Sequence, residues 1–475
     1  MTSLPASTKS LARTAKDLAK AALRPLANLG APERSPLPLA HWGLTSVDAH
    51  GLALEGHALH ELAARHGSPL HVVDVRKLRA NAAAFLHHPE GARGGCEVFY
   101  SYKTNPVPGV LRVLHESGIG AEVISAYELW LALRLGVAPD RIVYNGPYKG
   151  DDSIRDALRR GIGLLNFNHR EEIRGVARLA AEVGVRARVG VRVTTGEGWT
   201  GQFGVPIAGG AALETCRAVL AEPSLELVGI HAHRGIAIRS AAHVDAHVNA
   251  VLAFVDTLHT ALGFTPQILD LGGSLGTPTV APIDRLDARL NRTLGRSLPP
   301  PSVSDALRIE PYVERVVALV EAHFAARSLP RPRIFLEPGR AMTGNTQALV
   351  ATVRALNTSG ERTFAILDAG INVAETVRDN FHQIFPVNRH AQPNARRYTL
   401  VGPICTPGDL LCPSVDLPEL DVGDTLVIMD SGAYFVPFAT SFSFPQPAIV
   451  AVDGEHEYVM RRAETFEDLI VGDHL

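Results

Sequence analysis

Short apolar runs alternate regularly with segments of helical period through the middle of this sequence, and few folds accommodate such an alternation. Eight runs rich in Val, Ile, Leu and Tyr end in small or polar residues, at 98–102, 121–125, 142–145, 164–167, 187–193, 227–231, 268–271 and 334–336. Between them lie segments that carry Leu, Ala and Val at helical spacing, such as 127–135, 153–160, 171–182 and 211–220. Eight strand–helix units over about 250 residues predict an α/β fold with a (β/α)8 barrel.

The pattern changes after residue 343. Runs that resemble strands are separated by Gly, Pro, Asp and Asn with little helical period between them, at 348–355, 363–367, 425–429 and 448–452. This pattern predicts a C-terminal antiparallel β domain over residues 344–475. It leaves residues 77–343 for the barrel.

The segment before the barrel divides into two parts. An extended run at 70–75 precedes the first barrel strand, so residues 44–76 are predicted to join the β domain from its N-terminal side. Residues 1–43 are predicted to form an arm. Its basic residues alternate with Leu and Ala before a Pro-rich run at 31–38, which is compatible with a solvated arm or with a weakly amphipathic helix.

Composition narrows the class of protein. With 475 residues, of which 46% are hydrophobic, the chain can bury two substantial cores. Its 46 basic and 49 acidic residues leave a net charge of −3, which argues against nucleic acid or a membrane surface as partner and favours a small molecule. The uncharged stretch 433–452 contains three prolines and is not predicted to cross a membrane.

The four cysteines favour a reducing, cytoplasmic setting. They stand at positions 96, 216, 405 and 412, and they show neither the density of a disulfide scaffold nor the spacing of a zinc site. No metal site is predicted.

The residues that follow each run are candidates for chemistry, because (β/α)8 enzymes act at the C-terminal ends of their strands. Lys103 follows the first run among aromatic and apolar neighbours, where partial burial is expected to lower its pKa and make its amine a nucleophile. A lysine that extends to solvent at the barrel rim is the alternative. The last two runs end in GGSLG (272–276) and EPGR (337–340), where glycine lets backbone N–H groups approach a phosphate.

An imine-forming lysine beside a phosphate site indicates pyridoxal 5'-phosphate, an aldehyde that carries a phosphate. The pyridine ring of this cofactor accepts electrons only while its nitrogen stays protonated, which requires a carboxylate beside it. Glu337 is the candidate carboxylate. A salt bridge between Glu337 and Arg340 is the alternative.

Eight short motifs extend this set of residues. They are YSYKTNP (100–106), GAEVISAYEL (120–129), GIHAHRG (229–235), LDLGGSLG (269–276), EPGR (337–340), DAGIN (368–372), VGPICTPGD (401–409) and DSGAY (430–434). In this order they resemble the fold-type III pyridoxal phosphate enzymes of the diaminopimelate and ornithine decarboxylase family. The resemblance implies a barrel of the alanine racemase type, decarboxylation of an amino acid at Cα, and a homodimer with shared active sites.

The resemblance also implies roles for individual residues. Lys103 would hold the cofactor covalently, His233 would lie flat against its ring, and Glu337 would pair with the ring nitrogen. The remaining cofactor contacts, most of them to the phosphate, would come from Gly235, Gly272, Gly273, Ser274, Arg340 and Tyr434. Cys405 would reach the active site from the other subunit and return a proton to Cα, so that Lys103, His233 and Cys405 are the predicted catalytic residues.

Some residues depart from the family pattern, and two of these departures concern the ligand-binding sites. Ile236 stands where a phosphate-binding serine is usual. Thr406 stands where an acidic residue usually reads the distal ammonium of diaminopimelate or a diamine. Diaminopimelate and lysine-like diamino acids are therefore predicted to be poor substrates, and an acidic or conjugated amino acid is expected instead.

The other departures concern single positions. Ser274 replaces the third glycine of a GGG motif, which is tolerable if its φ is negative, and Glu122 replaces an aspartate. Beside Thr406, the predicted substrate contacts are Asp368 and Arg378, the latter to a distal carboxylate.

Two alternatives remain open from the sequence. One is an amino acid racemase on the same fold, although such enzymes place an arginine at the cofactor nitrogen where Glu337 stands here. The other is a catalytically silent decarboxylase-like regulatory subunit. Retention of Lys103, Glu337, Arg340 and Cys405 argues against that loss of function.

Overall fold

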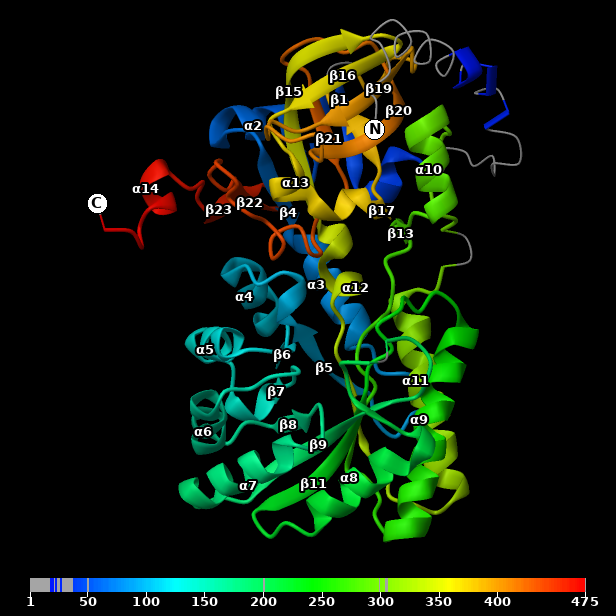
Figure 1. Cartoon of the computed structure of the whole chain (residues 1–475), viewed down its shortest axis with the longest axis vertical. Helices are drawn as coiled ribbons and strands as arrows, with labels where there is room; N and C mark the ends of the chain where they lie inside the picture. Colours follow the sequence, from blue (N-terminus) through cyan, green and yellow to red (C-terminus); the bar gives the residue numbers. More distant parts are fainter. Residues whose placement is uncertain are drawn as a thin grey trace, which may run out of the picture.

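The computed structural model describes residues 18–20, 22–23, 26–27, 37–48, 51–199, 201–298, 300–303 and 306–474. Most of the predicted N-terminal arm lies outside these residues. Figure 1 shows a barrel with a β domain above it, and α3 and α12 between the two.

Eight parallel strands close the barrel, and each overlaps one of the eight predicted runs. They are β5 (Cys96–Ser101), β6 (Gly120–Val123), β7 (Ile142–Tyr144), β8 (Leu164–Phe167), β9 (Ala187–Thr194), β11 (Leu225–Ala232), β12 (Ile268–Asp270) and β14 (Arg333–Leu336). The ring closes through the pairing of β14 with β5 and of β8 with β9. The predicted (β/α)8 barrel is confirmed.

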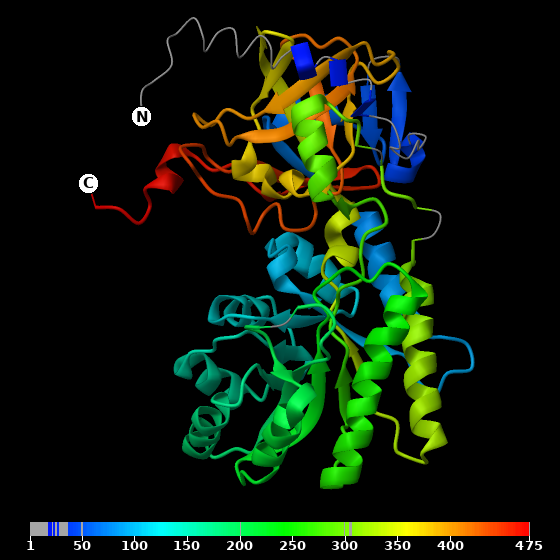
Figure 2. The ribbon, with the colours of Figure 1, turned by 45° about the vertical axis from the view of Figure 1, so that its right-hand side comes forward.

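Helices cover the outside of the barrel (Figures 1 and 2). They are α3 (Val75–Phe85), α4 (Pro108–Glu116), α5 (Ala126–Arg134), α6 (Asp151–Arg160), α7 (Glu172–Val183), α8 (Ala211–Leu220), α9 (Ala241–Leu262) and α11 (Ile309–Ala326). Helix α6 shows why such segments form helices. It begins with Asp151 and Asp152 and ends with Arg159 and Arg160, and Gly161 follows at φ 68°. Both charge placements favour the helix dipole, and glycine adopts the left-handed cap without strain.

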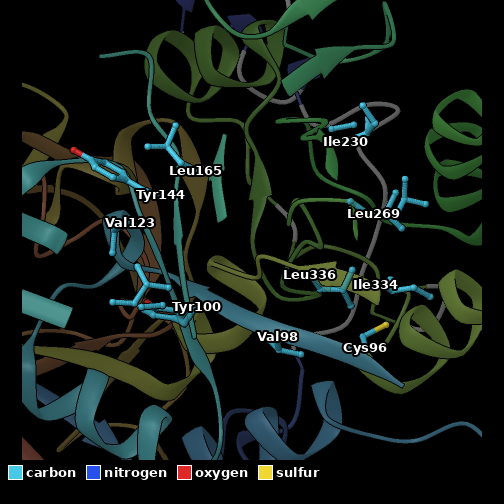
Figure 3. Close-up of a cluster of buried hydrophobic side chains, with 14 of the residues drawn as sticks. Cys96, Val98, Tyr100, Val123, Tyr144, Leu165, Ile230, Leu269, Ile334 and Leu336 are labelled. Atoms are coloured by element: carbon cyan, nitrogen blue, oxygen red, sulfur yellow. The ribbon is translucent and has the colours of Figure 1, made fainter. Parts of the chain in front are cut away.

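Two apolar layers hold the barrel together. The larger lies between strands and helices and includes Val98, Tyr144, Leu165 and Leu336 (Figure 3). The smaller fills the inside of the barrel with alternate strand residues, namely Phe99, Val143, Leu164, Val228, Ile268 and Phe335. A Cβ at Gly120 would come within 2.6 Å of the Phe99 ring, so the packing of this interior requires glycine at that position.

The β domain is a second sheet whose order is β20-β19-β16-β15-β4-β22-β23, with β21 pairing with both β15 and β18. Its strands are β4 (Leu70–Asp74), β15 (Gln347–Ser359), β16 (Arg362–Leu367), β18 (Ile384–Pro386), β19 (Arg396–Val401), β20 (Leu410–Leu417), β21 (Thr425–Ile428), β22 (Ala448–Asp453) and β23 (His456–Arg461). Strand β4 lies between β15 and β22, as expected for a segment that joins this domain from the N-terminal side. The domain boundaries after residues 43, 76 and 343 stay predictions.

The predicted β domain forms a separate sheet in which most strand pairs are antiparallel and two are parallel. Strand β22 runs parallel to β4, and β16 runs parallel to β19. The parallel β4–β22 pair joins strands almost 400 residues apart in the sequence, with the whole barrel between them, so no short-range turn signal in the sequence could reveal their relative direction.

Shorter elements complete the described fold. Before the barrel lie η1 (Leu39–Trp42), β1 (Leu44–Asp48), β2 (Gly51–Leu54), β3 (His57–Ala58) and α2 (Leu59–His66). In the connections of the barrel and in the β domain lie η2 (Tyr102–Thr104), η3 (Pro139–Arg141), β10 (Val205–Pro206), η4 (Ala208–Gly210), β13 (Ala281–Pro282), α10 (Arg285–Leu294), α12 (Arg340–Thr343), η5 (Gly344–Thr346), α13 (Ile371–Ala374), η6 (Glu375–Arg378), β17 (Asn380–Phe381) and α14 (Phe466–Leu469). None of the described helices has the length and apolar character needed to cross a membrane.

Candidate active site

A ring of eight polar side chains occupies the C-terminal end of the barrel interior, one from each strand or from the residue directly after it. Five of them stand two positions after a side chain of the interior layer and the other three stand two positions after a glycine, so the period of two along a strand points them into the barrel. At Gly120, Gly190 and Gly229 the interior residue has no side chain, which leaves room for the layer above. The ring consists of the buried Ser101, Glu122, Asn145, Asn166, Arg192, His231, Asp270 and Glu337.

Lys103 lies beside this ring, in η2 directly after β5. Its Nζ donates to Glu122 Oε2 at 3.0 Å, and Ser101 Oγ donates to the same oxygen. Burial opposes the charge on Lys103, but Glu122, Tyr434 and Glu337 outweigh it and raise its pKa. The prediction of a lowered pKa was therefore wrong, because the sequence showed the apolar neighbours of Lys103 and not the carboxylates across the barrel.

Glu337 is the buried carboxylate that directly follows β14. Asn145 Nδ2 donates to Glu337 Oε1 at 2.6 Å and to Glu122 Oε1 at 2.9 Å, and His231 Nε2 lies 3.3 Å from Glu337 Oε2. Burial on its own would raise the pKa of Glu337, but His231, a hydrogen bond from Asp270 and the charge of Lys103 together lower it. Glu337 is thus held as an anion, and the basic side chain within ion-pair distance of it is His231 rather than Arg340.

His233 and the glycine-rich loop after β12 lie against each other. Gly273 N–H donates to His233 Nδ1 at 3.2 Å, and a Cβ at Gly272 would meet the same nitrogen at 2.7 Å. Burial and the positive charges of Lys103 and Arg192 lower the pKa of His233 well below its ordinary value. His233 is therefore a neutral imidazole, which suits a ring that packs flat against another ring.

Ser274 shows a second departure from expectation, because its φ is +74° and not negative. This left-handed conformation costs a non-glycine residue about 1 kcal/mol. Two hydrogen bonds offset the cost: Ser274 Oγ accepts from Gly235 N–H at 2.8 Å, and Ser274 C=O accepts from Ile238 N–H at 2.7 Å. The serine thus ties together the loops that follow β11 and β12.

Arg340 and Tyr434 form the other side of the site. The Arg340 guanidinium lies 5.1 Å from the centre of the Tyr434 ring, and its buried Nη1 has no hydrogen-bond partner among the described residues. Tyr434 N–H donates to Thr104 C=O at 2.8 Å, which fastens the β domain to the loop that bears Lys103. A buried guanidinium with a free N–H is a binding group for an anion such as phosphate.

Cys405 and Thr406 stand on an exposed loop of the β domain, and no described contact joins them to Lys103 or Glu337 in the same chain. The loop is held by the buried Asp409, whose two oxygens accept N–H groups from Ile371 at 2.8 Å and Ile404 at 2.7 Å. Sequence reasoning missed Asp409, although it closes the quoted motif VGPICTPGD.

Asp368 and Arg378 are not brought together by the structure. Asp368 accepts from Thr352 N–H at 2.9 Å and from Arg354 Nε at 3.0 Å, so both of its oxygens serve the β domain. These contacts hold Asp368 within the β domain, and its role as a substrate contact stays a prediction. Arg378 is exposed and lies 3.2 Å from Glu375.

The residues present fit pyridoxal phosphate. The site combines a lysine near a carboxylate-lined barrel mouth, an anionic Glu337, a buried Arg340 with an unused N–H, and glycine backbone that approaches His233 closely. These groups provide a covalent anchor, a partner for a protonated ring nitrogen, and donors for a phosphate. They define a barrel enzyme that binds this cofactor.

Comparison with known proteins agrees with this assignment. The family model for the pyridoxal-dependent decarboxylases, pyridoxal binding domain, matches residues 76–344. The diaminopimelate decarboxylase of Methanothermobacter thermautotrophicus is 30% identical over 427 residues, which cover 87% of this chain and 94% of that protein. The diaminopimelate decarboxylase of Pseudomonas aeruginosa is 31% identical over 440 residues, covering 89% and 97%. A crystal structure from Aquifex aeolicus aligns with a TM-score of 0.78 at 27% identity, covering 92% of this chain and 100% of that one.

The chain belongs to the pyridoxal-dependent decarboxylase family. It is a pyridoxal phosphate-dependent amino acid decarboxylase, as the motifs predicted. These relatives give no support to the alternatives of a racemase or a silent regulatory subunit.

The sequence patterns did not single out six of the ring residues, namely Ser101, Asn145, Asn166, Arg192, His231 and Asp270, although three of them lie within the quoted motifs. Each follows an interior residue of its strand by two positions, and this spacing is the signal that could have found them.

Proposed function

We propose that this enzyme decarboxylates, at Cα, an amino acid other than diaminopimelate, with an acidic or conjugated side chain. The observation that carries the proposal is Thr406, which stands where the family resemblance places an acidic residue. Its hydroxyl accepts from Gly408 N–H at 3.3 Å and brings no negative charge to this loop. A distal ammonium would lack its counter-charge there.

Each residue of the site has a separate role in binding the cofactor. Lys103 would anchor the cofactor, Arg340 and the loops at Gly235 and Gly272–Ser274 would hold its phosphate with Tyr434, and His233 would support its ring. When bound, pyridoxal phosphate accepts the electron pair that the departing carboxylate leaves at Cα. Glu337, kept anionic by its surroundings, would hold a proton on the ring nitrogen.

A homodimer with shared active sites is the second part of the proposal. Cys405 is exposed on its own chain, and Asp409 fixes the loop that presents it. An exposed cysteine on an anchored loop suits a residue that completes the site of a second copy, where it would return the proton to Cα.

A cavity beside the same loop supports an extended substrate. It has a volume of ≈ 710 Å³, lies between α10 and the β domain, and is lined by Pro407 and Gly408 together with Arg378 and His382. Burial lowers the pKa of His382 to about 4, so its ring is a neutral hydrogen-bonding group. Amide, hydroxyl or carboxylate groups on a conjugated amino acid would find polar partners in this cavity.

The substrate proposal predicts a low activity toward diamino acids. We expect kcat/KM for meso-diaminopimelate and lysine to be at least about 100-fold below that for the best acidic or conjugated amino acid, because the distal ammonium has no counter-charge at Thr406. Release of CO2 from a panel of amino acids, measured with the purified holoenzyme, checks this.

The variant Thr406→Glu is the matched control, since it restores the acidic group and should raise turnover of diaminopimelate. The competing candidate is diaminopimelate itself, which is favoured by the names of the curated relatives. Turnover of diaminopimelate by the wild type at the level of the best substrate would establish that candidate and reject ours.

The shared site predicts complementation between two inactive variants. Lys103→Ala and Cys405→Ala should each have little activity alone, whereas co-expression should recover about a quarter of wild-type activity, because half of the dimers are mixed and each mixed dimer holds one complete site. Co-expression of Lys103→Ala with Lys103→Arg is the control and should recover nothing. Absence of recovery in the first pair would show that Cys405 acts within its own chain or not at all.

We also propose a cytoplasmic setting. All four cysteines are free, and Cys96 and Cys216 are buried, which agrees with a protein that folds without disulfides.

A further inference from the structure

We propose that Trp199 is a positioning residue that clamps the loop after β11 and thereby sets the affinity for pyridoxal phosphate. This loop, residues 234–238, includes the predicted phosphate contact Gly235. The inference concerns the cofactor and does not depend on which amino acid is decarboxylated.

Trp199 lies directly on this loop. Its backbone N–H donates to Arg234 C=O at 2.9 Å, and a Cβ at Gly235 would come within 2.2 Å of its indole ring. The neighbouring Gly198 is equally close, because a Cβ there would meet Arg234 O at 1.9 Å. Backbone and ring of the Trp199 segment therefore both pack against residues 234–235 without a gap.

Described residues that follow Trp199 in the chain hold its ring in place. The ring of Trp199 stacks on Phe203 at 5.6 Å between centroids, and the Arg192 guanidinium lies 4.8 Å from the centre of the Phe203 ring. Asn168 anchors the end of the segment, donating to Gln202 C=O at 3.0 Å and accepting from Gly204 N–H at 3.2 Å. The Trp199 ring is thus held in place where it contacts the loop.

Hydrogen bonds connect the loop that Trp199 contacts with the cofactor site. Gly235, at φ 74°, donates its N–H to Ser274 Oγ at 2.8 Å, and Ser274 lies 3.4 Å from His233 Nε2. The ring of Trp199 also lies 6.0 Å from that of His233, between centroids. A shift of Gly235 would therefore disturb both the glycine-rich loop and the histidine that supports the cofactor ring.

This chain has a particular need for such a clamp. The residue after Gly235 is Ile236, half-exposed and without a hydroxyl, and the N–H of Gly235 itself donates to Ser274 Oγ, so the donors that this turn leaves for a phosphate are backbone N–H groups such as that of Ile236. The direction of those donors depends on the backbone conformation alone. An aromatic ring that fixes the conformation replaces, in effect, the side-chain hydroxyl that the loop lacks.

The test is the dissociation constant for pyridoxal phosphate, measured by equilibrium dialysis on the full chain. We expect Trp199→Ala to raise it about 10-fold and Trp199→Phe, which keeps an aromatic ring, to leave it within about twofold of wild type. Trp130→Ala is the matched control, since Trp130 is similarly exposed on α5, and it should leave the constant unchanged. At saturating cofactor, kcat of Trp199→Ala should stay within a few-fold of wild type.

A double variant distinguishes clamping from a general loss of structure. Gly235→Ala should weaken cofactor binding strongly in the wild type, because its methyl group meets the indole ring and because alanine is strained at a φ of 74°. The loss should be smaller in the Trp199→Ala background, where only the backbone strain remains. Equal effects of Gly235→Ala in both backgrounds would overturn the proposal, as would an unchanged dissociation constant in Trp199→Ala. A fall in thermal midpoint in Trp199→Ala without weaker cofactor binding would also overturn it.

Discussion

Replacement of Lys103 by alanine is expected to abolish covalent attachment of the cofactor and to lower kcat/KM by about 10³-fold or more, in the range found for loss of a covalent catalytic group. The reason is that no other lysine can replace it. Among the described residues, the other lysine near the polar ring at the barrel mouth is Lys149, and its Nζ is paired with Glu172 at 2.6 Å. Absorbance of the purified protein and mass spectrometry after borohydride treatment check the attachment. The wild type should carry a pyridoxyl group on Lys103, and the variant none.

Lys103→Arg separates covalent chemistry from charge. Arginine can still pair with Glu122, which accepts from Lys103 at 3.0 Å, so this variant should stay closer to the wild type in thermal stability than Lys103→Ala does. It should be as inactive as alanine, because a guanidinium does not form the covalent bond. Activity of either variant within tenfold of wild type would refute the role of Lys103.

The barrel could be predicted because its signal is local. Each strand and each helix has its own period of hydrophobicity, and these periods are visible in a window of ten residues. The same holds for Lys103 and Glu337, which directly follow predicted strands. Motifs of this kind place a residue at the barrel mouth without any knowledge of its neighbours.

The contacts inside the site could not be predicted in this way. Asn145 and Glu337 are 192 positions apart, and only closure of the barrel brings their side chains to 2.6 Å. The sign of the pKa shift at Lys103 depends on the same closure, because Glu122 and Glu337 reach it from other strands. Burial can be inferred from neighbours in the sequence, whereas the charges that outweigh it cannot.

The contacts of Asp368 could not be predicted for a related reason. Its motif, DAGIN, matched the family, but the structure shows that the aspartate binds Arg354 and the backbone of Thr352. A conserved-looking acidic residue serves a strand pairing as readily as a ligand, and only its partners distinguish the two.

Glu337→Gln is the second variant with a large expected effect, a loss of about 10²–10³-fold in kcat, as found when one preorganised electrostatic group is removed. The side chain keeps its size and can still accept from Asn145, so the fold should be preserved. What it loses is the negative charge that would keep the ring nitrogen protonated. Single-turnover release of CO2 at saturating cofactor and substrate measures the effect on chemistry alone.

Asp270→Asn is the matched control, because it tests which carboxyl of the buried pair carries the charge. Burial and the negative charge of Glu337 raise the pKa of Asp270 well above its ordinary value, whereas the pKa of Glu337 is lowered, which favours a protonated Asp270 beside an anionic Glu337. Asparagine can donate in its place, and kcat should stay within about tenfold of wild type. A loss in Asp270→Asn as large as that in Glu337→Gln would place the charge on Asp270 instead, and with it the partner of the cofactor nitrogen.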